Sequence, residues 1–156
     1  MNTGKKLEAK IKQACIEQDV DYTRMKDAGW NGEQTARRFT SRNICDCILF
    51  YNRTLLFAEI KRRAKSLTFA SVTQYDDLCD KWLPDKFIYS GVICELDERV
   101  FFVSVPAMKS MMDKLGKKSF NATDASEYGM EIAMVVPHKK RTARPVIWEL
   151  INRLTS

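Results

Sequence analysis

The chain has 156 residues and a formal net charge of +6 at pH 7, with 45% apolar and 29% charged residues. These values are typical of one globular domain that forms its core without disulfides or a structural metal, and the excess of positive charge predicts an anionic partner. His138 is the single histidine, which argues against Ser-His-Asp, Cys-His and histidine-metal chemistry. A catalytic site in this chain is therefore expected to use carboxylates and lysine.

The cysteines and the longest apolar runs predict a soluble protein of a reducing compartment. The five cysteines are odd in number and lack CxxC spacing, and the chain begins with a polar, lysine-rich stretch. We therefore expect free, mostly buried thiols and a cytoplasmic location. No apolar run approaches the ~20 residues needed to cross a bilayer, so we expect no membrane association.

Charge is distributed unevenly along the chain. Residues 1–65 carry 14 basic and 8 acidic side chains, residues 66–136 carry 7 and 11, and residues 137–156 carry 5 and 1. Both ends are therefore basic and the middle is acidic. Neither a repeat nor a Pro/Gly/Ser-rich linker interrupts the sequence, which predicts a single domain over residues 1–156.

The first half of the chain predicts a helix followed by strands. Apolar residues spaced i, i+4 and i+7 predict a helix over residues 4–18. A short strand at 21–25 precedes a polar, arginine-bearing segment, residues 26–42, which we interpret as a protruding basic arm. Two apolar runs at 43–51 and 54–62 predict a β-hairpin, whose two-residue turn is Asn52-Arg53.

The second half alternates further helices and strands. Ser71 and Gln74 form a capping-box pattern for a helix through Trp82. The later elements expected are strands at 87–94, 99–105 and 131–136 and helices at 106–116 and from Pro145 onward. This order predicts an α/β fold with a mixed central sheet flanked by helices.

Two carboxylates and a lysine are expected to lie together on the hairpin. In the register set by the two-residue turn, Asp46 lies directly opposite Glu59, and Lys61 points to the same face. Opposed carboxylates repel, so this pair needs a proton, the lysine or a divalent cation beside it. Mg²⁺ prefers carboxylate oxygens and leaves positions for a phosphate and an attacking water. The alternative interpretation is a solvated sheet face with a weak surface ion pair, although the apolar neighbours of both carboxylates favour partial burial.

These residues resemble a known nuclease motif. Asp46 followed by Glu59-Ile60-Lys61 is similar to the D-x(n)-(D/E)-x-K motif of the PD-(D/E)XK nuclease superfamily, with Cys45 where the superfamily's name places proline. The leading helix, the basic arm and the segment from Phe69 to Gln74 extend the likeness to RecU-like Holliday junction resolvases, including small phage-borne versions. The resemblance covers about residues 4–105.

The resemblance implies a restriction-endonuclease-like core, a site and an activity. Asp46 and Glu59 would bind Mg²⁺ or Mn²⁺, and Lys61 would be catalytic together with Glu8 and Gln74. The basic arm, residues 26–42, would enter the centre of a four-way junction, and the enzyme would act as a homodimer in a bacterial or phage-infected cell. For two of these residues a structural role is the alternative to a catalytic one. Glu8 suits a surface ion pair with Lys12 at i, i+4, and Gln74 suits a helix cap.

Basic side chains near the motif and at both ends are candidates for DNA contacts. The arm also contains aromatic residues able to stack on unpaired bases, whereas a solvated charged loop is the alternative for the tail. The candidates are Arg37, Arg38, Arg42, Arg62, Arg63, Lys65, Lys139, Lys140 and Arg141.

The sequence therefore predicts a metal-dependent endonuclease that resolves Holliday junctions by phosphodiester hydrolysis. A superfamily nuclease acting on other DNA, such as a restriction or repair endonuclease, would share the same residues. A DNA-binding protein without catalytic activity would keep the basic ends without needing the carboxylates.

Overall fold

The computed structural model describes residues 3–25, 43–136 and 142–156, so the predicted basic arm lies outside the described residues. The helices are α1 (Thr3–Glu17), α2 (Tyr75–Asp80), α3 (Val105–Leu115), α4 (Ala122–Tyr128) and α5 (Ile147–Thr155), with 3₁₀ turns η2 (Phe69–Ser71) and η3 (Pro84–Lys86). The strands are β1 (Asp21–Arg24), β2 (Cys47–Tyr51), β3 (Thr54–Arg63), β4 (Ser66–Thr68), β5 (Ile88–Leu96), β6 (Arg99–Ser104), β7 (Ser119–Asn121), β8 (Met130–Glu131), β9 (Met134–Val135) and β10 (Arg144–Pro145).

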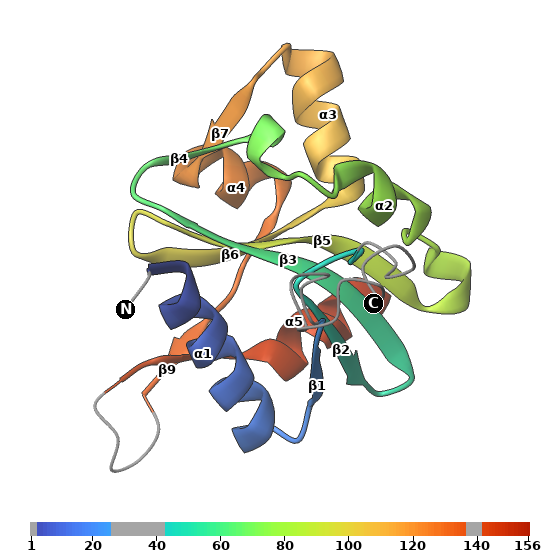
Figure 1. The fold of residues 1–156 in the computed structure, drawn as a ribbon, viewed down its shortest axis with the longest axis vertical. Coiled ribbons are helices and arrows are strands. Elements are labelled where there is room, and N and C mark those ends of the chain that lie inside the picture. The colour runs from blue at the N-terminus through green and yellow to red at the C-terminus, as the bar shows by residue number, and fades with distance from the viewer. Residues whose placement is uncertain (1–2, 26–42, 137–141) are drawn as a thin grey trace, which may run out of the picture.

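A six-stranded mixed sheet forms the centre of the molecule (Figure 1). Its strand order is β1-β2-β3-β5-β6-β8. β3 and β5 run parallel, and the other neighbours are antiparallel. The parallel pair requires a long crossover, which the chain supplies through β4, η2 and α2. The predicted mixed α/β sheet flanked by helices is confirmed.

Helices cover both faces of the sheet and create two cores. α1 and α5 lie on one face, and α2, α3 and α4 lie on the other (Figure 1). In α1 the predicted apolar stripe is buried, with Leu7, Ile11 and Ala14 at most 1% exposed. No helix within the described residues is long and apolar enough to span a membrane.

The hairpin of β2 and β3 has the predicted turn and register. Tyr51 pairs with Thr54, and the pairing continues to Cys47 opposite Ala58. Asn52 and Arg53 both have positive φ, at 49° and 62°, as a type I′ turn requires. The backbone twist of a type I′ turn matches that of the flanking strands. Asn52 and Arg53 therefore determine the register in which β2 and β3 pair.

Replacing Arg53 by glycine is expected to stabilise the protein. Arg53 occupies the left-handed region, which is costly for any residue with a Cβ. We expect Arg53→Gly to raise the free energy of unfolding by about 0.5–1 kcal/mol, measured by urea denaturation. Arg53→Ala keeps the Cβ and is the control; an equal gain for alanine would contradict the explanation.

Several predicted boundaries in the second half are wrong. The helix expected from Ser71 begins at Tyr75, and the one expected from Pro145 begins at Ile147 because Pro145 pairs with Met134 in a short ladder. The single strand expected over 131–136 is divided into β8, which pairs with β6, and β9, which pairs with β10. α4 was not predicted, although its capping box begins at Asn121. Pairing with a partner strand overrides the local pattern at Pro145 and over 131–136.

The cysteines are free thiols, as predicted. Cys15, Cys45, Cys47 and Cys94 are buried, and Cys79 is half-buried. Burial raises the pKa of the Cys15 and Cys45 thiols to about 12, so both stay protonated near neutrality and behave as small apolar side chains.

Candidate active site

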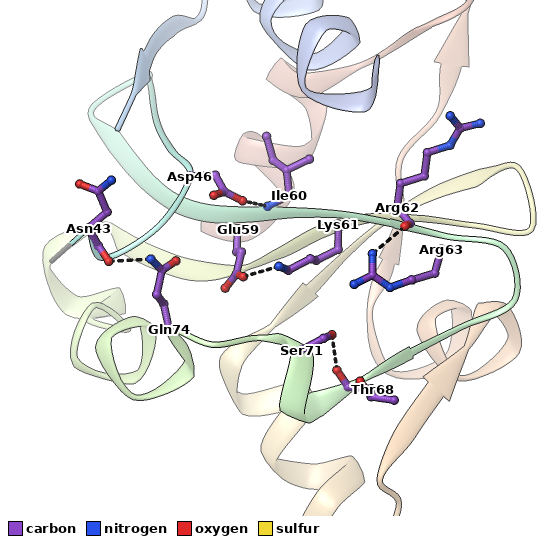
Figure 2. Close-up of polar contacts among 10 residues, drawn as sticks. All are labelled: Asn43, Asp46, Glu59, Ile60, Lys61, Arg62, Arg63, Thr68, Ser71 and Gln74. Carbon is purple, nitrogen blue, oxygen red and sulfur yellow. Dashed lines mark hydrogen bonds and ion pairs between the residues drawn. The ribbon is translucent and has the colours of Figure 1, made fainter. Parts of the chain in front are cut away.

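Glu59 and Lys61 form the centre of the candidate site. They project from the same face of β3 (Figure 2), because residues two apart in a strand share a face. Lys61 Nζ lies 2.9 Å from Glu59 Oε1, and the side chains are 22% and 2% exposed. This is a largely buried ion pair rather than the weak surface pair that was the alternative interpretation.

Asp46 immediately precedes β2 and is hydrogen-bonded to β3, the strand that carries Glu59 and Lys61. The expectation that it pairs directly with Glu59 in the ladder is wrong, because regular pairing ends at Cys47 and Ala58. Instead the Asp46 N–H donates to the Ala58 carbonyl at 3.1 Å, and Asp46 Oδ2 accepts the Ile60 N–H at 2.7 Å (Figure 2). The carboxylate is thus held at the backbone of the residue between Glu59 and Lys61.

The Glu59 carboxyl occupies an unfavourable place for a negative charge. Burial raises the pKa of this carboxyl above its ordinary value, and the charge of Asp46 adds to the rise. The hydrogen bond and charge of Lys61, and more weakly the backbone N–H of Gln74, oppose the rise. Glu59 Oε2 is buried without a hydrogen bond of ordinary geometry to the described residues. A buried, unsatisfied carboxylate oxygen has a free-energy cost unless something pairs with it.

The residues present fit a divalent cation with few protein ligands. Glu59 Oε2 has no hydrogen bond of ordinary geometry to the described residues, and Asp46 accepts the Ile60 N–H through Oδ2. Within the described residues no group of three or more His, Cys, Asp or Glu side chains gathers as a metal site. Mg²⁺ is commonly bound by one or two carboxylates together with waters and substrate phosphates, so two carboxylates are an adequate donor set.

The raised pKa of Glu59 predicts a stability effect. A carboxyl whose pKa is higher in the folded state than in the unfolded state favours folding below the unfolded pKa, and this contribution is lost as the pH rises through the folded pKa. In EDTA, the stability of Glu59→Gln relative to wild type is therefore expected to increase as the pH rises from acidic to neutral. Thermal unfolding of both proteins from pH 4 to pH 8 measures this difference in stability. The prediction is contradicted if the variant loses stability relative to wild type as the pH rises from 4 to 8.

Gln74 lies beside the carboxylates but does not cap α2 with its side chain. The predicted capping box is wrong: Ser71 Oγ donates to the Thr68 carbonyl at 2.6 Å, and Gln74 Nε2 donates to the Asn43 carbonyl at 2.8 Å. Figure 2 shows Gln74 on the Glu59 side of β3. The glutamine amide is therefore used for a tertiary contact 31 residues away in sequence.

Glu8 is held by residues of β1. Arg24 Nε lies 2.9 Å from Glu8 Oε1, and the Tyr22 hydroxyl donates to the same oxygen at 3.4 Å. The surface pair with Lys12 is replaced by this contact to the edge strand. Arg24 pairs with Cys47, which follows Asp46, so Glu8 is one strand away from the hairpin that carries the carboxylates.

The basic residues after Lys61 divide between the two faces of β3. Arg62 lies on the α1 side (Figure 2), where its Nε is 2.8 Å from Glu95 Oε1. Arg63 and Lys65 are exposed at the end of the strand. Together with Glu95 and the β5–β6 turn they line a hollow of about 570 Å³. Glu95 is a buried acid that the sequence reasoning missed, although an isolated charge inside an apolar strand is a signal for it.

The remaining candidates lie outside the described residues. They are Arg37, Arg38 and Arg42 in the basic arm, and Lys139, Lys140 and Arg141 near the C-terminus. Their predicted contacts with DNA stay predictions.

Neither a protein-family model nor a curated protein matches the chain. Among solved structures, the chain is similar to Hjc of Archaeoglobus fulgidus, a Holliday junction resolvase from an archaeal hyperthermophile. The TM-score is 0.58, the sequence identity is 17%, and the match covers 95% of this chain and 99% of that one. The class that the architecture defines is the restriction-endonuclease-like fold, as predicted. The solved structure with this fold to which the chain is similar is archaeal Hjc.

Proposed function

We propose that this protein is a metal-dependent endonuclease that resolves four-way DNA junctions. The observation that carries the proposal is the buried Glu59 carboxylate beside Asp46: one oxygen pairs with Lys61, and the other has no hydrogen bond of ordinary geometry to the described residues. Two clustered carboxylates and a lysine on adjoining strand segments can support metal-assisted phosphodiester hydrolysis without a histidine. The fold shared with a Holliday junction resolvase supports branched DNA as the substrate.

The proposed chemistry assigns a separate task to each side chain. Asp46 and Glu59 would hold Mg²⁺ or Mn²⁺, which when bound supplies positive charge at the phosphate and lowers the pKa of a water. Lys61 balances the charge that develops on the phosphoryl oxygens, and Glu59 Oε1 orients its ammonium. Glu8 and Gln74 complete the proposed site. Their described contacts are with Arg24 and Tyr22 and with the Asn43 carbonyl.

The proposal extends to DNA contacts and assembly. Exposed Arg63 and Lys65 follow the site along β3, where they suit phosphates near the cleaved bond. Arg62, the basic arm and the C-terminal basic residues are further proposed contacts. Because a four-way junction is cut on two strands, we propose a two-fold homodimer with one site per chain, acting in the cytoplasm. Light scattering of the protein alone measures its mass.

Cleavage of matched DNA substrates tests the proposed function. The full chain is incubated with a synthetic four-way junction, a flap and a linear duplex, each with Mg²⁺, with Mn²⁺ and with EDTA. We expect paired cuts in the junction that require the cation. Preferred cutting of the flap or duplex would assign a nuclease with another substrate. Binding without cleavage of any substrate in either metal would assign a DNA-binding protein and overturn the proposal.

A further inference from the structure

Gln74 contacts the segment that leads into Asp46 and lies on the same side of β3 as Glu59. Its side-chain Nε2 donates to the Asn43 carbonyl, three residues before Asp46, at 2.8 Å (Figure 2). Figure 2 shows Gln74 on the side of β3 from which the Glu59 carboxylate projects. A single residue at the start of α2 therefore holds the Asp46 segment with its side chain on the Glu59 side of the strand.

The segment that leads into Asp46 lacks regular strand pairing. Residues 43–46 precede β2 and lie in neither a helix nor a strand. Asp46 itself is held by the Ala58 carbonyl, the Ile60 N–H and the Met25 N–H, which donates to the Asp46 carbonyl at 2.9 Å. These bonds hold Asp46 between the ends of β1 and β3. The Gln74 amide holds the same segment toward α2, on the face where Glu59 projects.

We propose that Gln74 is a positioning residue that holds the Asp46 segment beside Glu59, so that both carboxylates face one divalent cation. The inference rests on the proposed function and adds a role for a residue that does not itself touch the cation. The amide is required because the partner is a carbonyl, which needs an N–H donor. A glutamate at this position would place a carboxylate against that carbonyl.

Metal binding without DNA separates this role from a general effect on activity. Mn²⁺ is titrated calorimetrically into the wild-type chain, Gln74→Met, which keeps the side-chain length without the donor, and Gln74→Ala. Residues that orient metal ligands typically change metal affinity by 10–100-fold. We expect the Mn²⁺ dissociation constant of both variants to rise by about tenfold, with the stoichiometry per chain unchanged.

Ser71→Ala is the matched control. It also removes a side-chain hydrogen bond to a backbone carbonyl, that of Thr68, in the same crossover segment, but it does not touch the Asp46 segment. We expect wild-type Mn²⁺ affinity for this variant. In junction cleavage, the Gln74 variants should need about tenfold more Mn²⁺ for half-maximal rate and recover most of the wild-type rate at saturation.

The outcomes distinguish this inference from the proposed function. Wild-type Mn²⁺ affinity in Gln74→Met and Gln74→Ala, in a protein whose wild type binds Mn²⁺ and cuts junctions, overturns the positioning role alone. An equal loss in Ser71→Ala also overturns it, because the effect would then belong to the whole crossover. A wild-type chain that neither binds Mn²⁺ nor cuts DNA overturns both.

Discussion

Glu59→Gln is expected to lower the rate of junction cleavage by about 10³-fold while leaving junction binding unchanged. The substitution keeps the size of the side chain and an oxygen for Lys61, but it removes the charge that would hold a cation. Loss of metal-assisted charge stabilisation is worth several kcal/mol in the transition state, which corresponds to a factor of this size. Single-turnover cleavage in Mg²⁺ gives the rate, and a gel-shift assay in EDTA gives the affinity.

The same substitution at an exposed acid controls for a general effect of charge. Glu127 lies on α4 and is exposed, so Glu127→Gln should cleave at the wild-type rate. A Glu59→Gln variant that cuts a junction as fast as wild type would show that the site is elsewhere. A variant that loses both cleavage and binding would mean that Glu59 supports the fold of the DNA-binding surface.

Lys61→Met is expected to lower cleavage by about 10²-fold and to shift the metal dependence toward higher pH. The ammonium is proposed to balance transition-state charge, and removal of one such group commonly costs a factor of this order. It also opposes the raised pKa of Glu59. Without it the pKa of Glu59 rises further, so the carboxylate that binds the cation forms only at higher pH.

Metal titrations at several pH values test the second part of this prediction. The Mn²⁺ affinity of Lys61→Met should fall below that of wild type at acidic pH, and the two should converge as the pH rises. Lys86→Met, at an exposed lysine of η3, is the control. A pH profile of Mn²⁺ binding that matches wild type would contradict the electrostatic link between Lys61 and Glu59.

Elements determined by neighbouring residues could be read from the sequence. Positive φ at Asn52 and Arg53 makes a two-residue turn and sets the register of β2 and β3. Ser104 caps α3, and Gly116 ends it in the left-handed region. The alternation of side chains along β3 places Glu59 and Lys61 on one face. The same alternation puts Arg62 on the opposite face, where it pairs with Glu95.

The sequence by itself determined the hairpin, the grouping of Glu59 with Lys61 and the mixed order of elements, because turns and periodic patterns depend on residues a few positions apart. Only the tertiary structure decided the side-chain partners: the Gln74 amide meets the Asn43 carbonyl, and Glu8 pairs with Arg24 instead of Lys12. It also placed Asp46 beyond the ladder and made the partial burial expected of Glu59 nearly complete. Burial and pairing depend on segments distant in sequence, whose approach no local pattern records. The basic surplus of the sequence predicted an anionic partner. The fold adds a buried carboxylate oxygen that has no hydrogen bond of ordinary geometry to the described residues and is suited to a cation.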